Sequence, residues 1–219
     1  MKKRLKIFAF LLIFTSAASL SFADNYLDFS AVLNLFNEHF PEDNYQRSQL
    51  GLHTGIAYHF FPSNSNFSLG TQLTIGTSFP MTERILRESM SARASSIFDL
   101  RIVCAPSYSI PLGSIFYFHM SLGPIFIYTN EKTSERLVSG STDYTYNAIT
   151  GGLQASTAFL LITSRGFLLR TGISMDSLLL RAEKGEMRMN YRTTHNSQFK
   201  GVRYYSFNFD FLFCLGFKF

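Results

Sequence analysis

Eight segments of the chain alternate apolar and polar residues with a period of two, which is the pattern of a β-strand with one apolar face. In one of them, Phe67, Leu69 and Leu73 fall on one side, whereas Ser68 falls on the other. The apolar sides contain no Asp, Glu, Lys or Arg. The charged residues within the segments all fall on the opposite side: Asp28, Asp99, Arg101, Arg170, Asp176, Asp210 and Lys218. The pattern predicts an all-β protein whose strands present two chemically different faces.

The order of the segments predicts how they are connected. They cover roughly residues 27–36, 50–60, 67–79, 98–110, 116–128, 149–161, 167–177 and 205–219. Long polar loops at about 37–49, 80–97, 130–147 and 182–204 alternate with short turns at 62–66, 111–114 and 163–166. This order predicts an eight-stranded antiparallel up-and-down sheet. Pro106 and Pro124 fall inside strands, where each removes a ladder donor, so we expect a bulge or a local gap there.

The first 23 residues read as a cleaved secretory signal peptide. Basic residues precede an apolar run from Ile7 to Phe14, and Ser21 and Ala23 occupy the −3 and −1 positions of a cleavage site before Asp24. The alternative is an N-terminal membrane anchor, but the apolar run is short for one. Removing the leader takes four of the 20 basic residues and leaves 16 against 15 acidic residues, a net charge of +1. The mature chain, 24–219, is then expected to form one domain with no marked charge.

The direction of the apolar face decides between two classes of barrel. A soluble exported barrel would turn its apolar side inward. Here that side is bulky, in a chain with 24 Phe, while the other side consists mostly of small polar residues. Eight strands leave an interior only just wide enough for side chains to fill, so the small set fits inside. The bulky apolar set must then face lipid, and a closed barrel satisfies its backbone hydrogen bonds there. We therefore predict a transmembrane β-barrel.

The final strand strengthens this interpretation. It ends in Phe219, with apolar residues at every second position before it: Phe213, Leu215 and Phe217. With its eight-strand pattern, the whole mature chain resembles the small outer-membrane barrels, the class that includes the OmpA transmembrane domain, OmpX and OmpW. The resemblance implies a location in the bacterial outer membrane, with outer-membrane lipid and the outer-membrane assembly machinery as partners, the latter reading the C-terminal strand. It also implies short turns and both termini in the periplasm, and long loops outside.

The inward charges need partners, because burying an unpaired charge is costly. Four acids and three bases fall on the inward side, so we expect a paired polar network that fills the interior. Asp28 and Lys218 lie near the ends of the first and last strands, which closure makes neighbours, and we expect them to face each other. The alternative is that both reach periplasmic water.

No catalytic or metal-binding constellation is expected. His119 and Ser121 have the spacing of the His-x-Ser pair of lipid A deacylases, but they fall on the inward side near a turn, and Leu122-Gly123 departs from that family's pattern. Loop residues His39, Asp43 and His195 are better read as solvated polar groups. The strand histidines are expected to be interior hydrogen-bonding groups: His53, His59 and His119. We predict a protein that is not an enzyme and has no cofactor or metal.

The two cysteines are expected to remain free thiols. Cys104 falls on the lipid side of the fourth strand and Cys214 on the inward side of the eighth, half a barrel away. A disulfide requires Cα atoms within about 7 Å of each other.

The loops are the remaining candidates for function, since binding residues concentrate on loops held by a rigid scaffold. The last long loop carries alternating Met187, Met189 and Tyr191, so it could extend as a hairpin above the membrane. Its basic residues are candidate contacts for a host or extracellular ligand: Lys184, Arg188, Arg192, Lys200 and Arg203. We expect a structural or adhesin-like role through these loops and no nucleic-acid partner. The alternative is a porin-like narrow channel for small solutes or hydrophobic molecules.

Overall fold

A computed structural model describes residues 24–40, 45–61, 66–85, 93–137, 140–189, 192–196, 198–202 and 204–218 of the 219-residue chain. The expected leader, the turn at 62–65, Asp43, Arg203 and Phe219 lie outside the described residues.

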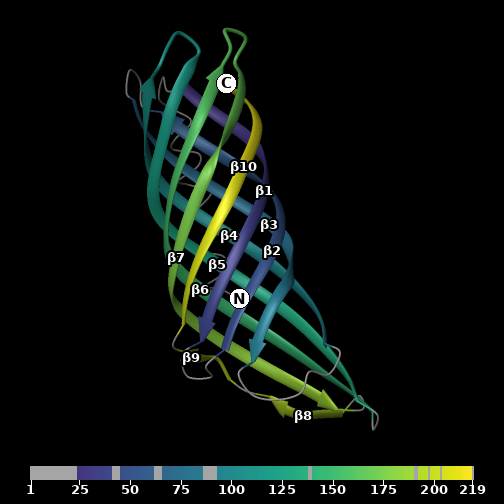
Figure 1. Cartoon of the computed structure of the whole chain (residues 1–219). Helices are drawn as coiled ribbons and strands as arrows, with labels where there is room; N and C mark the ends of the chain where they lie inside the picture. Colours follow the sequence, from purple (N-terminus) through teal and green to yellow (C-terminus); the bar gives the residue numbers. More distant parts are fainter. Residues whose placement is uncertain are drawn as a thin grey trace, which may run out of the picture.

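The described residues form ten antiparallel strands, eight of which close into a barrel (Figure 1). The strands are β1 (Asp24–Phe40), β2 (Tyr45–Phe61), β3 (Phe67–Ile85), β4 (Arg93–Pro111), β5 (Phe116–Leu137), β6 (Gly140–Ile162), β7 (Phe167–Met189), β8 (Arg192–Asn196), β9 (Lys200–Val202) and β10 (Tyr205–Lys218). Neighbours along the chain pair from β1 to β7, and β10 pairs with both β7 and β1, which closes the ring. The barrel wall therefore has the eight strands expected, and β8 and β9 pair with the C-terminal part of β7.

The two ends of the barrel differ. The turn end holds the short connections after β2, β4 and β6, together with Asp24 and Lys218. One of these turns is closed by a hydrogen bond from Gly166 N to Thr163 O of 2.9 Å, and Gly166 has a φ of 79°, a conformation that glycine adopts without a steric cost. The loop end is the opposite end, where β1 meets β2 and β5 meets β6, and β8 and β9 lie there (Figure 1).

The predicted direction of the two faces is confirmed. Along β10, exposed and buried side chains alternate from Tyr205 to Gly216, and Phe211 is 51% exposed although it lies in the middle of a strand. Large apolar side chains project outward all round the wall and form what we call the apolar belt: Phe29, Leu33, Leu52, Ile56, Leu73, Ile75, Ile102, Phe126, Leu153, Ile173, Phe211 and Phe213. Such a continuous outward band suits a lipid environment. The described residues contain no helix of the length and hydropathy needed to cross a membrane.

The prediction of long loops is wrong in one respect. Many of the described residues in these stretches continue the strands. β5 runs to Leu137 and β6 begins at Gly140, so nearly all of 130–147 is a paired hairpin. β1 likewise continues to Phe40 and β7 to Met189. These extensions have polar residues on both faces, so they lack the apolar alternation that reveals a membrane strand, yet their backbones complete the same hydrogen-bond ladders. The loop end is therefore a raised wall of strands.

The two prolines lie at a local gap in the β4–β5 ladder, as expected. The pairing stops at Val103–Ile125 and resumes at Ser107–Ser121. Pro106 and Pro124 fall in the unpaired stretches of the two strands, and the same register continues on both sides.

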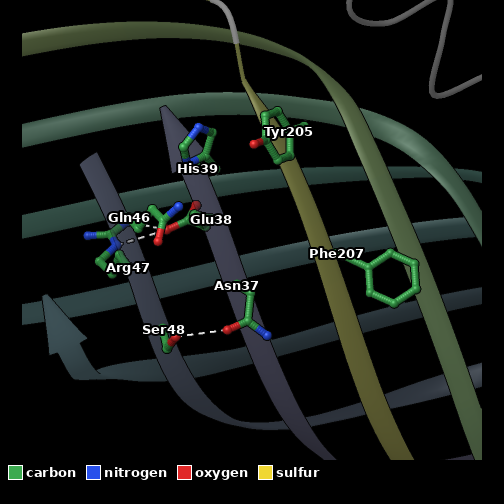
Figure 2. A pocket seen from close by; sticks show the side chains of 8 residues that line it. All are labelled: Asn37, Glu38, His39, Gln46, Arg47, Ser48, Tyr205 and Phe207. Atoms are coloured by element: carbon green, nitrogen blue, oxygen red, sulfur yellow. Dashed lines mark hydrogen bonds and ion pairs between the residues drawn. The ribbon is translucent and has the colours of Figure 1, made fainter. Parts of the chain in front are cut away.

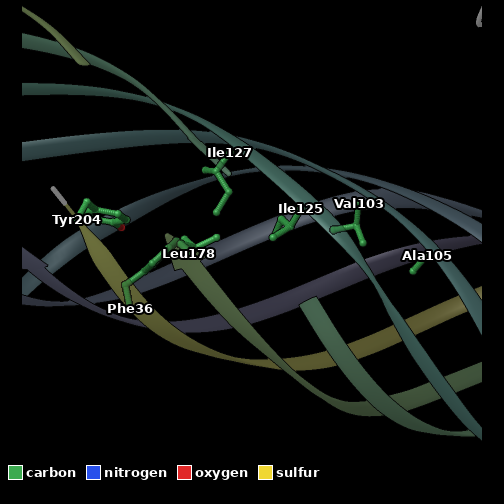
Figure 3. Packing of buried hydrophobic residues seen from close by; sticks show 7 residues of the cluster. All are labelled: Phe36, Val103, Ala105, Ile125, Ile127, Leu178 and Tyr204. Atoms are coloured by element: carbon green, nitrogen blue, oxygen red, sulfur yellow. The ribbon is translucent and has the colours of Figure 1, made fainter. Parts of the chain in front are cut away.

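Two apolar clusters occupy part of the interior. The larger one consists of Phe36, Val103, Ala105, Ile125, Ile127, Leu178 and Tyr204 (Figure 3). The smaller one, near the turn end, consists of Tyr26, Ala158, Leu160 and Leu168. Polar and charged side chains fill the space around these clusters.

Candidate functional site

The centre of the barrel interior, which we call the lumen, is bridged by Arg101. This residue projects inward from β4, and its Nη1 lies 3.3 Å from Asp210 Oδ1 on β10. Three strands lie between β4 and β10 in either direction around the ring, so this pair spans the full width of the lumen. The guanidinium also lies 3.8 Å from Asp176 on β7 and stacks 4.4 Å from the centroid of the Phe36 ring on β1. A single cation therefore joins β4 to three other strands of the barrel.

Hydrogen bonds hold the acids around this cation. Ser174 donates to Asp210 Oδ2 over 3.0 Å, and Asn34 donates to Oδ1 of the same carboxylate. Gln154 donates to Asp176 over 2.9 Å. These bonds fix the orientation of the Asp210 carboxylate, because rotating it would break the bonds from Ser174 and Asn34, while Gln154 holds one oxygen of Asp176.

Asp99 forms a second centre in the lumen. It accepts hydrogen bonds from Ser78 and Thr129 over 2.9 and 2.8 Å, and its Oδ2 lies 3.5 Å from His53 Nε2. His53 is therefore an interior polar group beside a carboxylate.

Near the turn end, Asp28 is paired with Arg170. Their closest atoms lie 3.0 Å apart, and His59 Nε2 approaches Asp28 to 3.4 Å. Lys218 departs from the expectation. The strand register sets it opposite Tyr26, one rung from Asp28, so its side chain lies exposed at the rim with Nζ 5.9 Å from the Tyr26 ring centroid. The expected Asp28–Lys218 pair is thus replaced by Asp28–Arg170.

A third network, at the loop end, centres on Glu38. Arg47 binds this carboxylate at 2.6 Å and Arg181 at 3.2 Å. Gln49 and Tyr204 donate to it over 2.6 and 3.0 Å. Arg47 also reaches Glu131 on β5 at 2.7 Å, so the network crosses the lumen from β2 to β5. We call this group the Glu38 cluster.

The sequence did not reveal the Glu38 cluster for two reasons. Glu38, Arg47 and Glu131 lie in stretches read as loops, where no apolar alternation marks the inward side. Arg181 enters the lumen because β7 has a bulge: Leu178 pairs with Gly152 and Leu180 with Gly151, so Leu179 is an extra residue. Leu179 and Leu180 both face outward, 64% and 72% exposed, and the alternation reverses after them. Two Gly residues opposite a Leu-Leu pair are the one local signal of this bulge.

Two small cavities lie between these networks in the part of the lumen that the described residues line. A cavity of about 20 Å³ lies beside His59, His119 and Arg170, and one of about 10 Å³ lies beside Phe36, Asp99 and Arg181. Each holds about one water molecule at most.

His119 and Ser121, which have the His-x-Ser spacing, each lie within hydrogen-bond distance of a serine on a neighbouring strand. His119 Nδ1 lies 3.0 Å from Ser109 Oγ, and Ser121 Oγ lies 2.6 Å from Ser156 Oγ. His119 is buried in the lumen, with its ring 5.8 Å from that of His59. The imidazole thus serves the interior hydrogen-bond network.

The remaining predicted residues belong to the barrel strands or to their extensions at the loop end. Phe213, Leu215 and Phe217 project outward from β10, in the alternation expected of the assembly signal. Cys104 is exposed on β4, Cys214 is buried on β10, and both are free thiols, as expected. Lys184 is half-buried on β7 and Lys200 is exposed on β9. Arg188 and Arg192 belong to β7 and β8, and their side chains lie outside the described part of the chain, as does that of His195.

Comparisons with known proteins support the fold. No family model and no curated protein matches the chain. Among solved structures, the outer membrane protein OprG from Pseudomonas aeruginosa matches with a TM-score of 0.57 and 11% identity, over 90% of this chain and 96% of that one. A major outer membrane protein from Thermus thermophilus matches with a TM-score of 0.52 and 10% identity, over 88% and 99%. The expected resemblance to small outer-membrane barrels is confirmed at the level of the fold. Together with the apolar belt, these matches show that the chain has the fold of the outer-membrane β-barrels.

Proposed function

We propose that this protein is a non-conducting outer-membrane barrel that acts through its loop end, as a structural or surface-contact protein. The observation that carries the proposal is the set of charge pairs across the lumen, with Arg101 and Asp210 on opposite walls and the Glu38 cluster nearer the loop end. A conducting barrel of eight strands would need a continuous polar path, and these side chains occupy that path.

The energetics favour a closed lumen. Opening it would separate guanidinium and carboxylate groups that are nearly fully buried, with exposed fractions of 3% and 4% for the Arg101 and Asp210 side chains. Removing one partner of such a buried pair costs about 3–5 kcal/mol, because the other charge stays buried without compensation, and moving the partner away has the same kind of cost. Several pairs would have to open together for a solute to pass.

The loop end is the part of the barrel best placed for contact. Its hairpins extend the wall beyond the apolar belt, and a wall of paired strands holds its outer residues in fixed positions. Lys132 and Ser134 are exposed on β5, and Lys200 on β9. Because these residues lie on paired strands, a partner could bind them without the entropy cost of ordering a flexible loop.

A solute-flux assay tests the proposal. Liposomes that contain the refolded protein are placed in an isotonic solution of a small sugar or amino acid, and swelling is followed by light scattering. We expect the same rate as in protein-free liposomes. Swelling that depends on protein amount and falls with solute size would instead assign the protein a channel function.

A further inference from the structure

A groove of about 420 Å³ lies on the wall at the loop end, beside β1, β2 and β10 (Figure 2). Its volume lies within the roughly 300–1,000 Å³ typical of small-ligand sites. Its lining residues come from adjacent rungs of the three strands: Asn37, Glu38, His39, Gln46, Arg47, Ser48, Tyr205 and Phe207. Alternation turns Glu38 and Arg47 into the lumen and the other side chains outward.

The groove begins where the apolar belt ends. On these three strands the last outward rung that is apolar on every strand is that of Leu35, which pairs with Leu50 and Phe209. The next outward rung is Asn37, paired with Ser48 on one side and Phe207 on the other. Two residues span about 7 Å along a strand. A molecule seated in the groove therefore lies directly above lipid chains that cover the belt, so an amphiphile can occupy both surfaces at once.

The polar groups of the groove suit hydroxyl groups. Ser48 donates to Asn37 Oδ1 over 2.8 Å, which leaves the Asn37 amide nitrogen as the remaining donor of that side chain (Figure 2). His39 Nδ1 is buried and has no hydrogen-bond partner among the described residues. Gln46 is exposed and can both donate and accept. Amides, imidazole and hydroxyl groups of this kind form hydrogen bonds with a sugar in either direction.

An aromatic surface completes the site. The rings of His39 and Tyr205 lie 4.5 Å apart at an angle of 40°, and Tyr205 is half exposed. The C–H bonds of a sugar ring pack against the electron-rich face of such an aromatic group.

The charge of the groove argues against a simple phospholipid headgroup. Its two charged lining residues, Glu38 and Arg47, are bound to each other at 2.6 Å and turned toward the lumen. The outward part of the groove therefore offers neutral hydrogen-bonding groups, which complement a neutral, hydroxyl-rich ligand better than a phosphate with an ammonium group.

From these observations we infer that the groove binds the saccharide of an outer-leaflet glycolipid, whose acyl chains lie on the apolar belt below. The inference takes the loop end to face outward, as the resemblance to the small outer-membrane barrels implies. It is independent of whether the lumen conducts.

Native mass spectrometry of the refolded full chain in detergent tests this assignment. A neutral glycosyl diacylglycerol and phosphatidylethanolamine are titrated separately, and bound lipid is counted. We expect saturable binding of the glycosyl diacylglycerol, with phosphatidylethanolamine at least about tenfold weaker. Asn37→Ala combined with Tyr205→Ala removes one hydrogen-bonding group and one ring face, and should weaken binding of the glycosyl diacylglycerol about tenfold.

Two further variants keep the test decisive. Gln46→Ala alters one exposed side chain only, so it tests the groove even if the double variant does not fold. It should weaken glycolipid binding severalfold. Asn130→Ala is the matched control, because Asn130 follows Phe126 and Tyr128 at the outer boundary of β5, on the opposite wall, and it should bind as the wild type does. Equal binding of the two lipids, or equal losses in the control and the groove variants, would show unspecific lipid contact and overturn the assignment.

Discussion

Arg101 on β4 and Asp210 on β10 meet at 3.3 Å from opposite walls of the barrel. A contact of this kind holds the barrel cross-section together in a way that backbone pairing alone does not, because the strands involved are not neighbours.

Replacing Asp210 by Ala should therefore destabilise the folded barrel by about 3 kcal/mol, since it leaves a buried guanidinium with only the more distant Asp176. Equilibrium unfolding in urea, followed by the heat-dependent shift in electrophoretic mobility, measures this change.

The paired replacement Arg101→Met with Asp210→Leu is the control for that prediction. It removes both charges and fills the space with apolar groups, so it should recover most of the lost stability. A double variant as unstable as Asp210→Ala would mean that the charge pair is not the cause.

Glu38 should contribute far more to the free energy of unfolding than Glu183, which also pairs with Arg181. Glu38 accepts contacts from Arg47, Gln49, Arg181 and Tyr204, and its side chain is 6% exposed. Glu38→Ala should cost about 3 kcal/mol of unfolding free energy by leaving two buried cations underpartnered.

Glu183 offers the matched comparison. It pairs with Arg181 at 3.1 Å, but its side chain is 30% exposed, so Glu183→Ala should cost less than about 1 kcal/mol. Equal effects of the two changes in the same urea titration would contradict the central place of Glu38.

Deleting Leu179 should leave the barrel folded. Leu179 is the extra residue of the β7 bulge, so its loss joins Leu178 to Leu180 in regular alternation and keeps Arg181 facing the lumen. Deleting Ile173, which pairs with Thr157 and Phe211 in unbroken ladders, shifts one part of β7 onto the wrong face and should abolish folding. Electrophoresis with and without boiling distinguishes the two. Failure of both deletions would contradict the assigned bulge.

The two thiols should react very differently. Cys104 is exposed to the membrane and Cys214 is fully buried, at 0%. A membrane-permeant maleimide should label one thiol per folded chain and two per unfolded chain, as counted by mass spectrometry. Labelling that persists in a folded Cys104→Ser variant would show that Cys214 is accessible.

The sequence predicts the membrane wall well because burial there follows a strict period of two. Leu33 and Phe211 can be assigned to the lipid side without knowing which strands pair. Arg101 and Asp210 can similarly be assigned to the interior.

The partners of the inward charges depend on register and barrel shear, which alternation does not encode. That is why Asp28 was expected opposite Lys218, whereas the ladder sets Gly216 opposite Asp28 and brings Arg170 to it. The sequence does not reveal the Glu38 cluster, because polar strand extensions resemble loops and because a bulge changes the face on which Arg181 lies.

Planar-bilayer recording of the refolded wild-type protein tests directly whether charge pairs close the lumen. A closed lumen predicts a silent membrane at voltages that leave the bilayer intact, in the presence of folded protein verified by its heat-dependent mobility. Discrete, reproducible openings from the wild-type barrel would contradict it.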